Sequence, residues 1–188
     1  MARIGLRNFR YSVLTEASDG TPSYAGPVTP GKAITCNVAI SNNDATLYAD
    51  DALAESDTTF QSGTVTMGID DDDITTMAAL LGHSVDNGTG AMTRNVTDTA
   101  PYVGLGRIIL KQVNNVYKYK VEFLYKVKFS EPSQEDNTKG ESVEFATTEI
   151  EGIVSALANG KWSITNVFDT YAEALSYLEG LLAASTSA

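Results

Sequence analysis

The run of residues 116–129, VYKYKVEFLYKVKF, constrains the fold more than any other part of the chain. From Tyr117 onward every odd position is apolar or aromatic, whereas the even positions are mostly charged and Leu124 is the exception. Because successive side chains of a strand point to opposite faces, this alternation places all the odd side chains on one face of a single strand. At about 3.3 Å per residue that strand spans roughly 45 Å, whereas a usual strand has about five or six residues. The pattern predicts a large sheet and favours a structural or assembling β-protein.

Length and cysteine content narrow the class of protein. A chain of 188 residues is typical of one domain with its own core. No apolar run approaches the roughly 20 residues of a membrane helix. The first residues, MARIGLRNFRYSV, lack the continuous apolar centre of a secretory signal. Because Cys36 is the one cysteine, we expect no disulfide and folding in a reducing cytoplasm.

Negative charge dominates the chain and is unevenly distributed. The formal net charge is −11, and the segment 44–98 holds eleven carboxylates with Arg94 as its one base. Six of the thirteen bases lie within 107–128. Affinity for nucleic acid comes mainly from Lys and Arg that displace condensed counterions, so this composition argues against a nucleic-acid-binding protein. Two interpretations stay open: an ordinary solvated acidic surface, or a surface that repels something anionic.

Periodicity predicts seven or eight strands with two helices packed on them. The segment ITTMAALLG, which ends at Gly82, predicts a short helix whose apolar side consists of Ile74, Met77, Ala78 and Leu81. A capping box at 170–173 opens a C-terminal helix. Two Asn residues at 114–115 predict a tight hairpin turn between strands 102–113 and 116–129. The other strands are expected at 4–15, 32–41, 60–69, 92–96, 143–154 with a bulge near 147–148, and 162–168.

Two polar segments are predicted to be long loops. The first, at 41–59, is acidic and holds only a short strand-like TLYA, and the second covers 130–142. A connection of this length inside a compact domain is usually functional, so both segments are candidate interaction loops.

Neither a catalytic site nor a site for a cofactor or metal is predicted, and we do not expect an enzyme. One cysteine and one histidine do not supply the common zinc spacings, and no phosphate-binding or nucleophile-elbow motif occurs. Cys36 is interpreted as buried filler rather than a reactive thiol. His83 is interpreted as a helix-end cap or an exposed side chain rather than a catalytic base. The run Asp70 to Asp73 is interpreted as helix capping rather than a cation site.

Five motifs occur in order along the chain: ATLYADD (45–51), LLGH (80–83), APYVGLG (100–106), FLYKVKFSEP (123–132) and TKGESVEFATTEIEG (138–152). Together they closely resemble the major tail proteins of long-tailed siphophages and prophages of Gram-positive bacteria, over roughly residues 3–170. The resemblance implies the phage tail tube fold. This is a mainly β domain at 1–170, a β-sandwich or partial barrel of about seven to eight strands flanked by an α-helix, followed by a C-terminal helix and tail at 171–188.

The same resemblance implies a structural virion protein. Its copies form hexameric rings that stack around a tape-measure protein into the tail tube, the conduit for DNA ejection. Further implied partners are tail terminator and tail-tip or distal tail proteins, while DNA passes through without specific binding and no membrane is involved. The implied location is the virion, after assembly in the host cytoplasm.

Physical reasoning agrees with a tube at three points. Barrels open an aqueous channel only at about 16–18 strands, so several chains must share one barrel around DNA. An acidic wall repels phosphates and lets DNA slide. Stacked rings also need segments that reach a neighbour, and in the loop at 41–59 the predicted contacts to the adjacent ring are Tyr48, Asp50, Asp51 and Glu55. The predicted lumen-facing carboxylates are Glu144, Glu149 and Glu151.

Two other classes share parts of this pattern. A secreted or cell-surface β-sandwich binding module, such as an adhesin, would normally show a signal peptide and a cluster of exposed aromatic residues. A type VI secretion-like tube protein shares the physics of a tube but not the five motifs.

Overall fold

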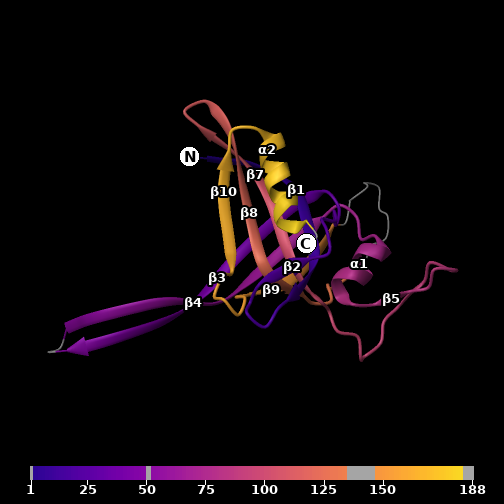
Figure 1. Ribbon diagram of the computed structural model, residues 1–188, viewed down its shortest axis with the longest axis horizontal. Coiled ribbons are helices and arrows are strands. Elements are labelled where there is room, and N and C mark those ends of the chain that lie inside the picture. The colour runs from indigo at the N-terminus through magenta and orange to yellow at the C-terminus, as the bar shows by residue number, and fades with distance from the viewer. Residues whose placement is uncertain (1, 50–51, 135–146, 184–188) are drawn as a thin grey trace, which may run out of the picture.

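The computed structural model describes residues 2–49, 52–134 and 147–183. The chain is mainly β and carries two helices, one of them C-terminal, which confirms the expected fold class (Figure 1). Its elements are β1 (Ala2–Glu16), β2 (Pro22–Tyr24), β3 (Ala33–Ala49), β4 (Ala52–Ile69), α1 (Ile74–Leu81), β5 (Ser84–Val85), β6 (Met92–Thr93), β7 (Tyr102–Val113), β8 (Val116–Phe129), β9 (Thr148–Ser155), β10 (Ser163–Phe168) and α2 (Tyr171–Leu182).

Eight of the strands form one antiparallel sheet. Its order is β2-β1-β7-β8-β9-β4-β3, and β10 pairs with β8 outside this path. β1 also contacts β3, although the two are not ladder neighbours, so the sheet curls towards a partial barrel. β5 and β6 form a separate two-stranded ribbon, so the strand expected at 92–96 is real but shorter. Among the described residues, no helix is long and apolar enough to cross a membrane.

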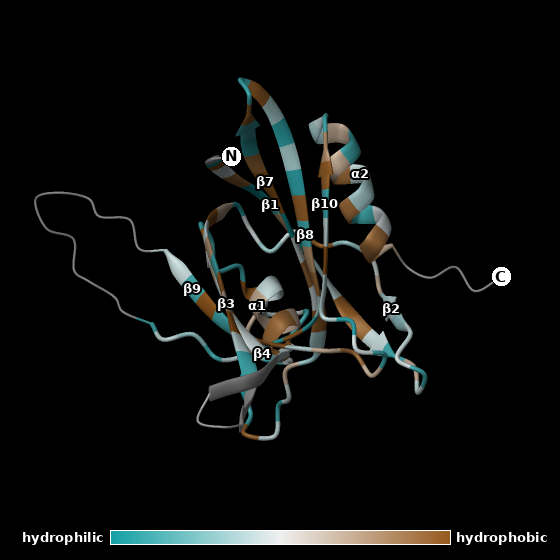
Figure 2. Cartoon of the chain, turned by 90° about the vertical axis from the view of Figure 1, so that its left-hand side faces the viewer, coloured by the Kyte–Doolittle hydropathy of each residue, from teal (hydrophilic) through white to brown (hydrophobic). Residues whose placement is uncertain are grey.

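The hairpin of β7 and β8 forms as the sequence predicts. Asn114 and Asn115 have φ angles of 50° and 62°, the left-handed values that a two-residue turn of this kind requires at both positions. The 14-residue strand β8 follows at once, and its alternation of polar and apolar residues is visible in Figure 2. The local sequence therefore determines this hairpin.

The prediction that all odd residues of β8 share one face is wrong. Val103 pairs with Val127 and Leu105 pairs with Leu124, so β8 carries one extra residue between these pairs. Such a β-bulge exchanges the two faces of a strand. Phe123 accordingly packs beneath α2, whereas Val127 packs with Leu124 on the opposite side of the sheet.

This bulge lies where β8 changes its partner strand. Residues 119–124 pair with β10, and residues 126–129 pair with β9. The sheet therefore forks at the bulge, with β10 on one branch and β9, β4 and β3 on the other. The fork produces two separate layers of buried side chains.

Each layer has its own hydrophobic core. The first core lies between the curled strands and α1, and its largest fully buried members are Phe9, Met67, Ile69, Leu80 and Ile150. The second core lies between α2 and strands β1, β7 and β8, and its fully buried members are Ile108, Val121, Phe123, Ala174, Leu178 and Leu182. Covering both faces of the central strands in this way removes about 25 cal/mol of unfavourable hydration per Å² of apolar surface.

Both predicted helices form with the predicted ends. Thr170 and Glu173 make the reciprocal hydrogen bonds of a capping box at the start of α2. The helix docks closely because β7 carries Gly106 beneath it: a Cβ there would lie 2.1 Å from Leu178 Cδ1. At the end of α1, Gly82 adopts a left-handed φ of 80°.

One helix face differs from the prediction. Ile74, expected on the buried side of α1, is 46% exposed, whereas Leu80 is fully buried in the first core. The first helical residue lies beyond the edge of the core, so the buried stripe is displaced towards the end of the helix. No bulge interrupts β9 within the described residues, because its register with β4 is continuous from Thr148 to Val154. Residues 135–146, which include part of the predicted loop at 130–142 and the start of the predicted strand at 143–154, lie outside the described residues.

Candidate functional site

The segment 41–59 is not the irregular loop that its composition predicts. Here β3 and β4 remain paired with each other from Ser41 and Ser62 to Ala49 and Ala52. β4 pairs with β9 only as far as Gly63, so beyond that point the two strands have no further partner within the described chain. We call residues 41–62 the arm. At about 3.3 Å per residue it is roughly 30 Å long, and it projects away from the body (Figure 1).

The wrong prediction has a simple cause. Polar residues on both faces hide the period-2 signal of a half-buried strand, so the sequence looks like a loop. The backbone groups between the two strands are nevertheless paired, because each strand supplies the hydrogen-bond partners of the other on that side. The arm begins at a register shift after Ser41, and Phe60 at its base stacks on Trp162 with ring centroids 4.6 Å apart.

The arm carries the residues predicted to contact an adjacent ring. Tyr48 is in register with Leu53, and Glu55 with Leu47, near the far end of the ribbon. Asp50 and Asp51 lie outside the described residues. The sequence of the arm holds five carboxylates and no Lys or Arg. The arm is therefore an acidic ribbon with free edges, the kind of element that pairs with other chains.

Two of the three predicted lumen carboxylates share one face of the sheet. Glu149 and Glu151 of β9 are exposed, and Ile150 between them is fully buried in the first core. Thr66 lies opposite Glu151, and Thr35 Oγ1 donates to Glu149 Oε1 at 3.4 Å. Strands β3, β4 and β9 thus present a largely polar, threonine-containing face with two carboxylates, which also carries Ile153, 53% exposed. Glu144 lies outside the described residues.

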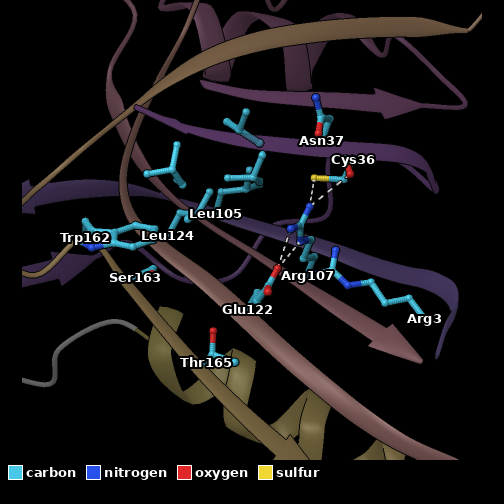
Figure 3. Close-up of a pocket in the computed structure, with 13 residues that line it drawn as sticks. Arg3, Cys36, Asn37, Leu105, Arg107, Glu122, Leu124, Trp162, Ser163 and Thr165 are labelled. Carbon is cyan, nitrogen blue, oxygen red and sulfur yellow. Dashed lines mark hydrogen bonds and ion pairs between the residues drawn. The ribbon is translucent and has the colours of Figure 1, made fainter. Parts of the chain in front are cut away.

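A cavity of about 260 Å³ opens between the two branches of the fork (Figure 3). At its wall, Arg107 is 9% exposed, and its Nη2 and Nε donate to Glu122 Oε2 at 2.6 and 3.0 Å. Lys120 also donates to the Glu122 carboxylate, and Arg107 Nη1 lies against the Cys36 sulfur. Burial raises the pKa of Cys36, which keeps the thiol protonated and a weak nucleophile at neutral pH. The cluster is therefore an ion-pair network in which two cations share the single carboxylate of Glu122.

This network could have been found from the sequence. Counting outward from a two-residue turn at 114–115 pairs Arg107 with Glu122, which is the observed register. The contact with Cys36 has no such signal, because β3 reaches β7 only through the curl of the sheet.

The Glu122 pair predicts a pH-dependent contribution to stability. Burial favours a higher pKa for Glu122, but hydrogen bonds from Lys120 and Arg107 outweigh it and hold that pKa below its ordinary value of 4.5. A depressed carboxyl pKa stabilises the fold above the unfolded pKa, and this stabilisation is lost as the pH falls through the folded pKa. We expect Glu122→Gln to lower the free energy of unfolding by about 1–3 kcal/mol at neutral pH.

Urea unfolding of both proteins at several pH values checks this prediction. The difference in stability should shrink below about pH 4.5. Glu151→Gln makes the same chemical change at an exposed site and should alter stability by less than about 0.5 kcal/mol. A Glu122→Gln difference that stays constant with pH would contradict the assigned ion pair.

The His83 side chain is not exposed and does not bond to the helix end, so the predicted role of this side chain is wrong, although its backbone N donates to the Ala78 carbonyl oxygen at 3.0 Å. The side chain is 5% exposed, with Nδ1 2.8 Å from Asp98 Oδ2 and Nε2 against Glu131 Oε1. The two carboxylates lie at opposite ring nitrogens, so the three groups do not converge on one point as metal ligands do. Sequence reasoning missed this cluster because its members are 15 and 48 residues apart.

The helix capping expected of the run Asp70 to Asp73 is confirmed for Asp73. Asp73 accepts a hydrogen bond from the Thr76 backbone N at 3.0 Å and is the N-cap. Asp70 instead accepts from the Lys32 backbone N at 2.7 Å, and Asp71 and Asp72 are exposed.

Comparison of the chain with models of known protein families and with curated proteins gives no match. A function for the chain therefore rests on its motifs and on the geometry described above.

Proposed function

We propose that this chain is a tail tube subunit of a long-tailed phage, which polymerises as stacked hexameric rings into the conduit for DNA ejection. The observation that carries the proposal is the arm, an acidic two-stranded ribbon roughly 30 Å long that leaves the body at Gly63. The ordered motifs at 45–51, 80–83, 100–106, 123–132 and 138–152 supply the specific resemblance to tail tube proteins.

An arm of this kind is suited to a partner. Two-stranded ribbons are at best marginally stable in water, because each strand has a ladder on one side only and little apolar surface is buried. A neighbouring copy of the chain can supply the missing contacts. The proposed contact residues to the adjacent ring are Tyr48 and Glu55, together with Asp50 and Asp51, which lie between them in the sequence.

The strand count also favours a shared barrel. An aqueous channel needs about 16–18 strands, and one chain contributes an eight-stranded sheet. Both β3 and β10 lie at sheet ends, where unpaired backbone groups are available to strands of another chain. A ring of six copies provides strands in excess of this requirement.

The polar face of β3, β4 and β9 is the proposed wall of the lumen. Its exposed Glu149 and Glu151, and Glu144 from the adjoining sequence, would present negative charge to DNA. Phosphates are repelled by such a wall, whereas Lys and Arg would bind them by releasing counterions. DNA then passes through without specific binding. The tape-measure, tail terminator and tail-tip or distal tail proteins are the proposed further partners, and the tube is the proposed site of the protein in the virion.

Negative-stain electron microscopy tests this function. We expect the purified protein, imaged before and after concentration to millimolar levels, to form rings and hollow tubes with a lumen wide enough for duplex DNA. Analytical ultracentrifugation over the same range should show growth through closed oligomers. A protein that stays monomeric throughout and binds glycans instead would contradict the tube and support a surface-binding module.

A further inference from the structure

The ring of His83 joins three segments that are distant in the sequence. His83 follows the end of α1, Asp98 belongs to the loop between β6 and β7, and Glu131 begins the segment after β8. Each ring nitrogen faces one of the two carboxylates, and the His83 side chain is 5% exposed. The ring therefore acts as a link between the helix end and two connections.

The link is complete only when the ring is protonated. A neutral imidazole has one N–H and can donate to one carboxylate, whereas the imidazolium donates to both. The hydrogen bond to Asp98 outweighs burial and, with the one to Glu131, raises the pKa of His83 above its ordinary 6.5. The further charged group at the cluster is Arg94, whose Nε lies 3.8 Å from Glu131 Oε2. Half-exposed pairs of this kind contribute little in water.

The two carboxylates respond differently to loss of the proton. The Asp98 side chain is 16% exposed and also accepts from the Asn95 backbone N at 2.8 Å, so leaving it unpaired costs its desolvation. Glu131 is 52% exposed and returns to water at little cost. The loop that carries Asp98 is also held to the helix end by close packing that does not depend on the proton. A Cβ on Gly82 would lie 2.2 Å from the Thr99 carbonyl oxygen, so the two backbones are in close contact there.

We propose that His83 is a proton-operated fastener for the segment that follows β8. The imidazolium holds Asp98 and Glu131 together, and the neutral ring keeps Asp98 through Nδ1–H and releases Glu131. This fastener sets how firmly residues 130–134 are held to the body. It goes beyond the proposed function and does not depend on it.

The pH range in which the fastener is closed follows from the pKa shifts of His83 and Asp98. The raised pKa of His83 means that its stabilisation is complete below 6.5 and is lost as the pH rises through the folded pKa. The pKa of Asp98 is lowered, first by the Asn95 backbone N–H and then by His83, so its contribution is complete above 3.8. The fastener is therefore closed in mildly acidic solution and opens on the alkaline side.

Nitrogen-15 NMR of the whole chain tests the proposal directly, because the sequence contains one histidine. We expect both ring nitrogens to be protonated at low pH, a titration midpoint above 6.5, and the Nδ1–H tautomer at high pH. In Glu131→Gln the midpoint should move to lower pH, since the ring loses one charged partner. Glu149→Gln is the matched control and should leave the midpoint unchanged.

Hydrogen exchange reports whether the segment is released. The Ser130 backbone N donates to the Glu151 carbonyl oxygen at 2.8 Å. Protection of the Ser130 amide from exchange therefore reports how firmly the start of the segment is held. Across the His83 titration its protection factor should fall about twofold to fivefold in the wild type and stay constant in Glu131→Gln. Protection of the Asn95 amide should not change. Three results would each overturn the proposal: a His83 titration midpoint at or below 6.5, a neutral ring protonated at Nε2, or Ser130 protection that does not change across the titration.

Discussion

A chain without its arm is expected to stay folded and to lose assembly. The test replaces residues 44–58 with Asn-Gly, which joins Asn43 to Thr59 across an existing register pair by a two-residue turn. Phe60 and its stack on Trp162 remain in place. Because the removed strands pair only with each other among the described residues, the body loses no ladder partner. We expect the stability of the monomer to change by less than about 0.5 kcal/mol.

Loss of assembly should be large. Removing a central contact of an interface commonly costs about 2–4 kcal/mol, so the concentration needed for tubes should rise by about 30-fold to 700-fold. Electron microscopy and sedimentation measure this directly. A second variant, Tyr48→Ala with Glu55→Gln, keeps the length of the arm and tests the proposed contact residues. Normal tubes from the shortened chain would end the claim that the arm joins neighbouring copies.

Truncating Phe123 to alanine is expected to remove much of the stability of the fold. The ring is fully buried in the second core and makes edge contacts with Tyr24 and Tyr125, with centroids 5.6 and 5.3 Å apart. Phe→Ala in a packed core costs about 3–5 kcal/mol. That loss is a large part of the 5–15 kcal/mol that usually separates a folded domain from its unfolded chain.

The matched control lies on the same strand. Tyr117 is also an odd-numbered aromatic residue of β8, yet it is 55% exposed, so Tyr117→Ala should cost less than about 0.5 kcal/mol. Urea unfolding followed by circular dichroism measures the stability of both variants. An unchanged dependence of the free energy of unfolding on urea concentration shows that the unfolding transition itself has not changed. Similar losses for the two variants would contradict the assignment of Phe123 to a core beneath α2.

The fork of the sheet and the cavity beside it could not be predicted from local sequence patterns. Alternation along β8 predicts its length but not the extra residue before Val127, because a bulge depends on the partner strands. β9 and β10 follow later in the chain, and packing decides where along β8 each of them pairs. The Arg107–Glu122 pair is an intermediate case, since the turn alone places the two residues opposite each other.

The candidate assembly residues divide in the same way. Their positions in the sequence, an acidic segment and alternating glutamates near β9, are visible without coordinates. That the acidic segment is a ribbon rather than a loop depends on cross-strand hydrogen bonds, which period-2 hydrophobicity does not report when polar residues occupy both parities of a strand. That Glu149 and Glu151 share a solvent face depends on the pairing of β9 with β4.

The sequence by itself determined the elements whose causes are local: the long strand β8, the Asn114-Asn115 turn, the capping box at Thr170 and the glycine end of α1. These features are set by interactions within a few residues. The tertiary structure alone decided the fork of the sheet, the separation of two cores, the arm and the His83 cluster. The fork, the two cores and the His83 cluster each bring together groups far apart in the chain, and their free energy comes from burial and pairing that exist only once the sheet has closed. The arm depends instead on hydrogen bonds between its own two strands.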